Sequence, residues 1–192
     1  MVFDYAGDDG DRILAWFRER LRAIGSCLST EHPEAVLALV YSGIDTLGLL
    51  AASPDIKDAG EKTYVSWCEK YIVNRFQSIE GHTVAAVDLY AARCGILHTS
   101  TPVSNRSRNG KAHEIWYQFQ GTAGVNLIAD AKLEPLGLEI EKLATAFREG
   151  GIAFITDLNS NPANRQQADS RAQHFLRWGI AHIEDSTAAS LE

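Results

Sequence analysis

The chain has 192 residues, 45% of them hydrophobic, so it is long and apolar enough to fold around a core and unlike polar chains that stay disordered. The formal net charge of -7 excludes a protein whose whole surface binds nucleic acid through Lys and Arg. The three cysteines are odd in number and include no C-x2-C pair, which favours reduced thiols over a disulfide or zinc framework.

The two ends of the chain carry no pattern of a folded element. The first residues lack the basic and apolar regions of a secretory signal, and we find no apolar run near the roughly 18 residues of a membrane span. We therefore expect a cytoplasmic protein that neither enters nor contacts a membrane. Residues 186–192 have no periodic pattern and are interpreted as a disordered tail or the remnant of a tag.

Apolar residues at spacings of three and four predict a first, amphipathic helix from Asp11 to Leu28. A Pro after His32 then favours the start of a second helix, from Glu34 to Ala52. This second helix is apolar almost all round, and Asp45 is its only charged residue after Glu34. We expect it to lie at the centre of a bundle and to face a partner subunit as well.

A third helix is predicted from Lys62 to Phe76 and a fourth from Val84 to His98. The stretch from Thr99 to Gly110 is rich in Ser, Thr, Asn, Pro and Gly, which predicts a loop. The β-branched and aromatic runs 115–119 and 125–129 then indicate a hairpin.

Helical spacing returns from Ile140 to Leu158, weakened in its middle by a Gly-Gly pair, and a last helix is predicted from Ala163 to Ile183. The fold class we predict is mainly α, a helical bundle with a small β-hairpin inserted after the fourth helix. A single domain would cover residues 1–185, with a core bundle at 11–98, the hairpin at 112–130 and C-terminal helices at 138–183.

One segment of this acidic chain is cationic. No Asp or Glu occurs from Leu89 to His113, whereas this stretch contains Arg93, His98, Arg106, Arg108 and Lys111. Two interpretations fit: a solvated loop that happens to lack acids, or a surface that binds phosphates.

The common sequence motifs for nucleotide cofactors, hydrolases and metal-dependent proteases are absent. The six histidines show none of the short paired spacings that hold zinc. We therefore expect no metal and no cofactor.

Arg93 and His98 form an Arg-x4-His pair at the end of the fourth helix. Cleaving RNA without a metal needs a proton carrier near neutral pKa and a fixed cation beside the phosphorus, and these two residue types supply both. Five residues correspond to a rotation of about 140° around a helix, so the side chains are not stacked unless the last turn distorts. The alternative is that Arg93 forms an ion pair with Asp45 or Asp88 and that His98 only caps the helix dipole.

An Arg-x4-to-6-His motif at the end of a late helix in an α-helical bundle resembles the HEPN superfamily. The resemblance covers about Glu34 to His113 and implies a homodimeric, metal-independent endoribonuclease of the kind found in toxin–antitoxin and phage-defence systems. It implies that His98 is the acid/base and Arg93 the phosphate stabiliser. The chain departs from the family at two positions: Cys94 follows the Arg where many members have a polar residue, and Ser100 stands where one toxin subgroup has Tyr.

The functional hypothesis is thus a HEPN-type ribonuclease that binds RNA through Arg106, Arg108 and Lys111, with an antitoxin or regulatory protein as a further partner. Tyr90, three residues before the Arg, either stacks on a base or packs against the second helix, and Cys94 is either reactive or structural. The competing hypothesis is a non-catalytic HEPN-like dimer that binds a nucleotide, a nucleic acid or a protein.

Overall fold

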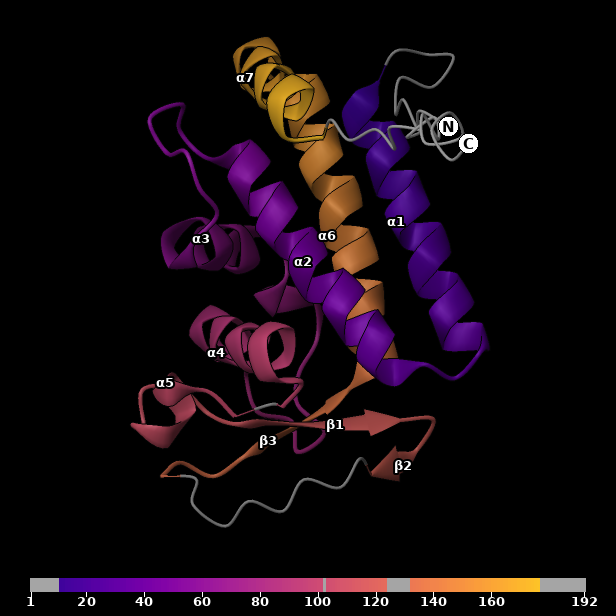
Figure 1. The fold of residues 1–192 in the computed structure, drawn as a ribbon, viewed down its shortest axis with the longest axis vertical. Coiled ribbons are helices and arrows are strands. Elements are labelled where there is room, and N and C mark those ends of the chain that lie inside the picture. The colour runs from indigo at the N-terminus through magenta and orange to yellow at the C-terminus, as the bar shows by residue number, and fades with distance from the viewer. Residues whose placement is uncertain (1–10, 102, 124–131, 177–192) are drawn as a thin grey trace, which may run out of the picture.

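The computed structural model describes residues 11–101, 103–123 and 132–176, and most of them are helical, as predicted (Figure 1). The predicted final stretch of the last helix, beyond residue 176, and the predicted strand 125–129 lie outside the described residues. The long helices are α1 (Arg12–Ser29), α2 (Pro33–Ala51), α3 (Glu61–Tyr71), α4 (Ala86–Thr99), α6 (Ile140–Ser160) and α7 (Pro162–Phe175).

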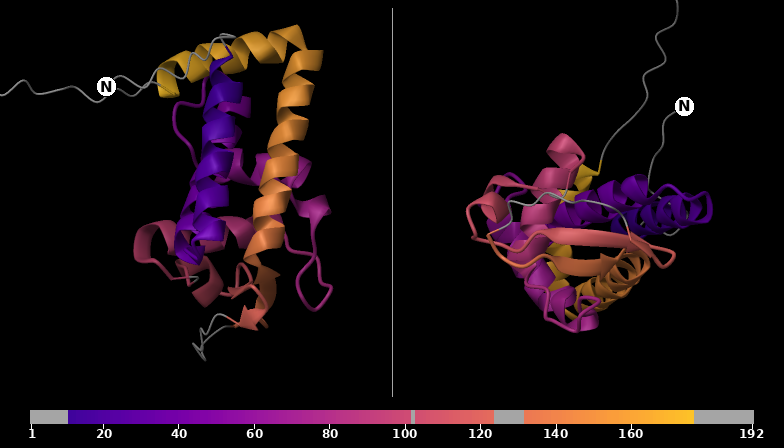
Figure 2. Two further views of the ribbon diagram at one scale, coloured as in Figure 1. Left: turned by 90° about the vertical axis from the view of Figure 1, so that its right-hand side faces the viewer. Right: turned by 90° about the horizontal axis from the view of Figure 1, so that it is seen from below.

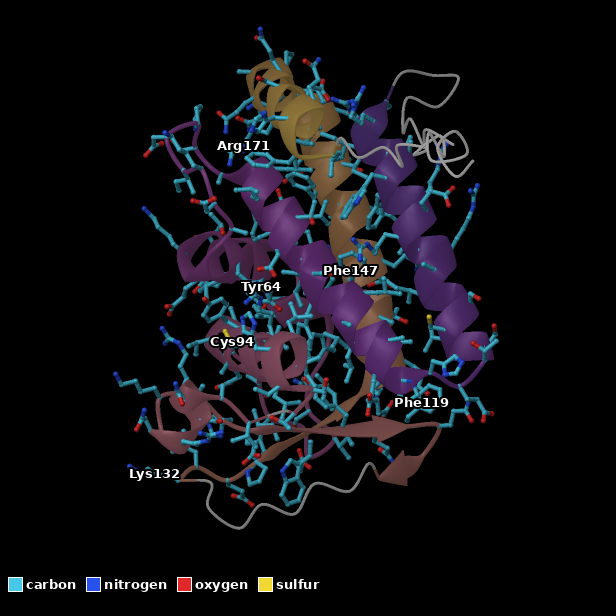
Figure 3. All side chains as sticks on the ribbon, viewed as in Figure 1. Tyr64, Cys94, Phe119, Lys132, Phe147 and Arg171 are labelled. Atoms are coloured by element: carbon cyan, nitrogen blue, oxygen red, sulfur yellow. The ribbon has the colours of Figure 1, made fainter. Side chains whose placement is uncertain are left out.

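Helix α2 is the central element, since it packs against α1, α3, α4, α6 and α7. Its apolar composition follows from this position, and Tyr41, Ile44 and Leu47 are fully buried. Tyr64 of α3 and Phe147 of α6, labelled in Figure 3, are also fully buried. These side chains belong to one continuous core.

The expectation that no apolar run is long enough to span a membrane was wrong for α2. Among the described residues this one helix reaches the necessary length and apolar composition. The core helix of a soluble protein passes the same test, and 56% of the α2 window is buried inside the structure.

Local side-chain interactions fix where several helices begin. The Asp11 carboxylate accepts a hydrogen bond of 2.9 Å from the backbone N–H of Leu14 at the start of α1. At the start of α4, Asp88 accepts one of 3.0 Å from the N–H of Ala85. Pro33 occupies the first turn of α2, where its missing N–H costs no helical hydrogen bond.

A three-stranded sheet lies across one end of the bundle, below α2, α4 and α6 in Figure 1 and seen from below in Figure 2. Strand β1 (Ile115–Phe119) turns back at Gln120 and Gly121 into the antiparallel β2 (Thr122–Ala123). The predicted hairpin is therefore present, but its turn comes earlier than predicted and Thr122 belongs to the second strand.

The third strand, β3 (Leu136–Glu139), was not predicted. It pairs in parallel with β1, with Ile115 opposite Leu136 and Tyr117 opposite Leu138. Four residues are too few to establish an alternating pattern in the sequence, and parallel pairing is formed by distant segments.

Two further boundaries differ from the prediction. Helix α3 ends at Tyr71 and is followed by a separate 3-10 turn, Val73–Arg75, instead of continuing to Phe76. The predicted loop from Thr99 to Gly110 contains a single helical turn, α5 (Asn105–Arg108). Ser104 caps that turn by accepting a hydrogen bond of 3.3 Å from the N–H of Ser107.

The glycine pair in α6 does not interrupt the helix, which continues through both residues. A Cβ atom on Gly150 would lie 2.6 Å from the backbone oxygen of Tyr71, and one on Gly151 would lie 2.2 Å from the ring of Phe17. The two glycines therefore let α6 approach α3 and α1 closely, which offsets their low helix propensity.

Candidate functional site

Helix α4 carries the candidate site and is anchored at both its start and its inner face. Leu89, Ala91 and Ala92 are buried against the rest of the bundle. Both carboxylate oxygens of Asp88 accept hydrogen bonds from backbone N–H groups. One caps the start of α4, and the other accepts a hydrogen bond of 2.7 Å from the N–H of His113. Asp88 therefore has a structural role. Of the two carboxylates considered as partners of Arg93, Asp45 and Asp88, it is Asp45 that pairs with the arginine.

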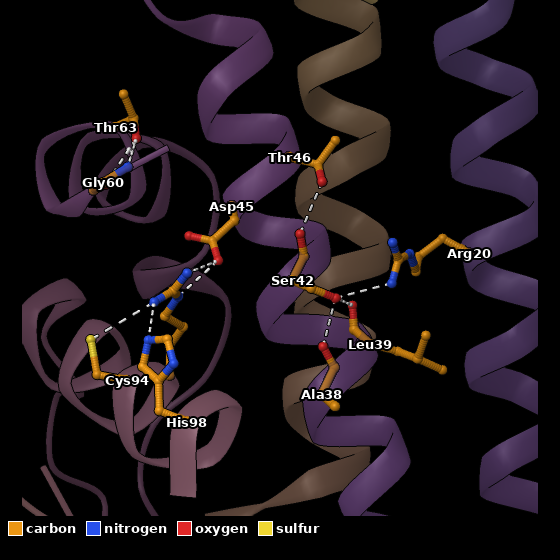
Figure 4. Close-up of polar contacts among 11 residues, drawn as sticks. Arg20, Ala38, Leu39, Ser42, Asp45, Thr46, Gly60, Thr63, Cys94 and His98 are labelled. Atoms are coloured by element: carbon orange, nitrogen blue, oxygen red, sulfur yellow. Dashed lines mark hydrogen bonds and ion pairs between the residues drawn. The ribbon is translucent and has the colours of Figure 1, made fainter. Parts of the chain in front are cut away.

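Arg93 forms an ion pair with Asp45 of α2 (Figure 4). Its Nε donates to Asp45 Oδ2 over 2.7 Å, and its Nη2 lies 2.6 Å from the same oxygen. The two side chains are mostly buried, with 19% of Arg93 and 12% of Asp45 exposed. The pair fixes the guanidinium against the central helix.

The pair is also electrostatically unusual. Burial raises the pKa of Asp45, although the hydrogen bond and the charge of Arg93 act in the opposite direction. Burial by itself would lower the pKa of Arg93, but the hydrogen bond and charge of Asp45 outweigh it and raise the value. The second carboxylate oxygen of Asp45, Oδ1, is buried and has no hydrogen-bond partner among the described residues.

His98 lies beside the same guanidinium, with 3.5 Å between its Nε2 and Nη1 of Arg93. Helix α4 stays regular through Thr99, so the contact comes from the reach of the arginine side chain and not from a distorted last turn. Because a guanidinium can only donate, Nε2 accepts here, which corresponds to a neutral ring with its proton on Nδ1. His98 itself is exposed.

Cys94 completes the close group, with its Sγ 4.0 Å from Nη1 of Arg93. Figure 4 shows the thiol and the His98 ring on the same side of the guanidinium, opposite Asp45. The thiol is half-buried. Arg93 Nη1 is thus the one guanidinium nitrogen that faces both His98 and Cys94.

Tyr90 extends the group towards the basic segment. Its ring centroid lies 6.0 Å from the Arg93 guanidinium carbon and 5.6 Å from that of Arg106, so two cations flank one aromatic ring. The Tyr90 ring also packs against the ring of Tyr64 of α3, with centroids 5.5 Å apart. Tyr90 thus packs against the third helix and also lies beside the two guanidinium groups.

The basic segment divides into two parts. Arg106 forms an ion pair with Glu61, the first residue of α3, so its charge is already partnered. Arg108 and Lys111 are exposed at the end of α5 and just after it. Glu61 was missed in the sequence, because a contact across 45 positions leaves no local signal and the predicted helix began one residue later.

A hollow of about 740 Å³ lies between α1, α2 and the end of α7, and Asp45 is one of its lining residues. Much of the remaining lining is apolar, including Trp16, Leu39, Leu49 and Phe175. The ion pair between Arg93 and Asp45 thus has the His98 and Cys94 side chains on its Arg93 side and the apolar lining of the hollow on its Asp45 side.

Among the residues that the structure describes, no three His, Cys, Asp or Glu side chains gather closely enough to hold a metal ion. What the group offers chemically is an anchored guanidinium, an exposed imidazole and a half-buried thiol.

Comparison with known proteins gives no match to this chain among family models, curated proteins or solved structures.

Proposed function

We propose that the protein is a metal-independent endoribonuclease of the HEPN type, with His98 as acid/base and Arg93 as the group that stabilises the phosphate. The observation that supports this most directly is the 3.5 Å separation of Arg93 Nη1 and His98 Nε2 at the end of α4. A cation and a proton carrier that lie this close can act on the same phosphodiester.

In the proposed reaction the RNA 2′-oxygen attacks the adjacent phosphorus, and the bond from phosphorus to the 5′-oxygen breaks. When RNA binds, Arg93 Nη1 turns from His98 Nε2 to the phosphate, and the freed Nε2 takes the proton from the 2′-hydroxyl. Arg93 stabilises the extra negative charge on the phosphorus oxygens, and its pairing with Asp45 keeps the guanidinium in place for that role. The products are a 2′,3′-cyclic phosphate and a 5′-hydroxyl.

The leaving 5′-oxygen needs a proton, which we assign to His98 of a second copy in a homodimer. His98 is exposed at the end of α4, so a second copy that docks against this end of the helix would bring its own His98 to the same phosphodiester. In this proposal Arg108 and Lys111 bind backbone phosphates, whereas Arg106, already paired with Glu61, orders the segment.

The biological setting that accompanies this proposal is a toxin–antitoxin or phage-defence system in the cytoplasm, with an antitoxin or regulatory protein as partner. Its basis is the motif resemblance together with the exposed position of His98, which a partner could cover.

The second candidate is a non-catalytic bundle that binds a nucleotide, a nucleic acid or a protein. The observation that favours it is that two guanidinium nitrogens, Nε and Nη2, are already engaged by Asp45, leaving Nη1 towards His98. An arginine held in this way also serves as an ordinary structural ion pair.

The two candidates are separated by incubating the purified protein with RNA in EDTA and mapping the cleaved ends. Cleavage by the wild type should fall by about 10²–10⁴-fold in His98→Ala and in Arg93→Ala. His32→Ala, which removes another exposed histidine at the start of α2, is the matched control and should cleave normally. RNA that stays intact with the wild type, or equal cleavage by wild type and His98→Ala, overturns the ribonuclease proposal.

A further inference from the structure

The sheet brings a lysine from a distant part of the chain to the basic segment. Strands β1 and β3 pair in parallel, with Ile115 opposite Leu136. The two segments also run side by side before the strands begin, because Nδ1 of His113 donates a hydrogen bond of 2.8 Å to the carbonyl oxygen of Glu134. This alignment places Lys132 beside the end of the basic segment.

Lys132 lies directly against Gly110. A Cβ atom on this glycine would be 3.3 Å from Cβ and 3.5 Å from Cδ of Lys132. Gly110 has a φ of +69°, a left-handed conformation that favours glycine, and the absent side chain lets the turn after α5 pass this close to the lysine. Figure 3 labels Lys132 at the edge of the molecule, below α5. Its side chain is exposed, so it adds a positive charge to this part of the surface.

The end of α5, the turn after it and the start of the segment leading to β3 thus form a cationic corner. Its three exposed cations are Arg108, Lys111 and Lys132. Arg106 is paired with Glu61, but none of these three pairs with a carboxylate among the described residues. Glu134 is exposed nearby, which gives three positive charges against one negative.

The backbone holds the two lysines of this corner in neighbouring segments. The N–H of Lys111 donates 2.9 Å to the carbonyl oxygen of Arg106, and the segment containing Lys132 is fixed to its neighbour at Gly110 and His113. Like charges on adjacent segments destabilise each other. An anion that binds both lysines relieves this repulsion, and the oxygens of a phosphate accept charge-assisted hydrogen bonds.

The cationic corner continues the candidate site. The guanidinium carbons of Arg93 and Arg106 lie 6.0 and 5.6 Å from the same Tyr90 ring, and α5 leads from Arg106 to Arg108. Figure 1 shows α5 between α4 and the start of β3. Positive charge therefore extends from the proposed cleavage group across α5 to the corner. A track of this kind suits a polyanion, whose phosphates are neutralised one after another.

From these observations we infer that Arg108, Lys111 and Lys132 form one phosphate-binding corner, and that an RNA strand held at Arg93 and His98 extends across α5 to reach it. The inference rests on the proposed function for the position of the cleaved phosphate. It adds Lys132, which lies outside the basic segment of the sequence, as an RNA-binding residue.

The test measures the binding of a short, fluorescent, single-stranded 2′-O-methyl RNA, which lacks the attacking 2′-hydroxyl and is not cleaved. Fluorescence anisotropy gives Kd between about 50 and 200 mM salt. Lys132→Met keeps an aliphatic stem against Gly110 and removes the charge. It should raise Kd by about twofold to fivefold and reduce the slope of log K against log salt concentration by about 0.7.

The matched control is Lys57→Met, which removes an exposed lysine from the loop between α2 and α3 and changes the net charge equally. It should leave both Kd and slope unchanged. Equal values for the two variants, or a wild type that does not bind the RNA, overturn the inference.

Binding and cleavage are read separately, so the two proposals can fail separately. If the lysine variants bind equally while the wild type cleaves RNA in EDTA, the ribonuclease proposal stands and the corner is wrong. If binding depends on Lys132 and no RNA is cleaved, the corner stands and the catalytic proposal is wrong. An acidic peptide of equal charge that binds more tightly than the RNA would assign the corner to a protein partner and overturn the inference.

Discussion

Gly150 in α6 is expected to be intolerant of a single added methyl group, although alanine is the better helix former. Inside an exposed helix, Gly→Ala stabilises by about 0.8–1.0 kcal/mol. At Gly150 the new Cβ would lie 2.6 Å from the backbone oxygen of Tyr71 and 3.0 Å from the side chain of Ile72. A backbone carbonyl cannot rotate away, so α6 and α3 must separate by several tenths of an ångström.

The magnitude follows from these two opposing terms. Overpacking costs about 1–3 kcal/mol, and a rigid backbone neighbour favours the upper end of that range. Subtracting the helix-propensity gain of about 1 kcal/mol leaves a net loss of about 2 kcal/mol for Gly150→Ala. The matched control is Gly25→Ala in α1, where a Cβ meets nothing within 4 Å and the expected change is a gain of about 1 kcal/mol.

Urea unfolding followed by circular dichroism measures both variants. The difference of about 3 kcal/mol corresponds to about 6–12 °C in Tm for a chain of this size. If Gly150→Ala is as stable as Gly25→Ala, the close approach of α6 to α3 is wrong and the glycine pair is merely a weak point in the helix.

Three further predictions concern buried polar groups. Burial, followed by the neighbouring phenol of Tyr117, raises the pKa of Tyr41 well above 10.0, so the unfolded state ionises first as the pH rises. The free energy of unfolding should therefore fall as the pH rises through about 10, and in Tyr41→Phe this slope should be shallower by up to about 1.4 kcal/mol per pH unit. Equal slopes in urea titrations at about pH 9–11 would contradict this. Arg171→Met removes the hydrogen bonds of 3.2 and 2.7 Å to the carbonyls of Ser53 and Ile56 and should lower the free energy of unfolding, measured in urea, by about 1–2 kcal/mol. An unchanged free energy would indicate that water replaces the lost donors. Asp45→Asn breaks the ion pair that joins Asp45 of α2 to Arg93 of α4 and should cost about 2 kcal/mol. This is less than the roughly 3–5 kcal/mol of a fully buried pair, because the guanidinium reaches water; unchanged urea stability would show that the pair adds nothing.

Most helices were predictable because the helical spacing of apolar residues is visible within the sequence of each helix. The amphipathic pattern of α1 and the apolar run of α2 give their bounds to within one or two residues. The prediction of elements and their boundaries failed where the interaction that decides them joins residues far apart in the sequence. Strand β3 exists because it pairs with β1 some twenty residues away, and the sequence 136–139 is too short to show a strand period.

The candidate site was predictable in its chemistry and only partly in its geometry. The Arg93 and His98 pair and the lone charge of Asp45 on an apolar helix are visible in the sequence. The choice of Asp45 over Asp88 was not, because Asp88 is taken up by backbone N–H groups at the start of α4 and of the segment at His113. The pairing of Arg106 with Glu61 was equally invisible, since it joins two helices through space.

The sequence by itself determined that the chain is mainly helical, that α2 is central and that the polar chemistry gathers around Arg93, because hydrophobic period and charge placement are local properties. The tertiary structure alone decided which carboxylate pairs with the arginine, that its Nη1 lies within 3.5 Å of His98, and that the glycines of α6 are contact points. The physical reason is that these depend on distances between elements, which are set by the packing of the whole core.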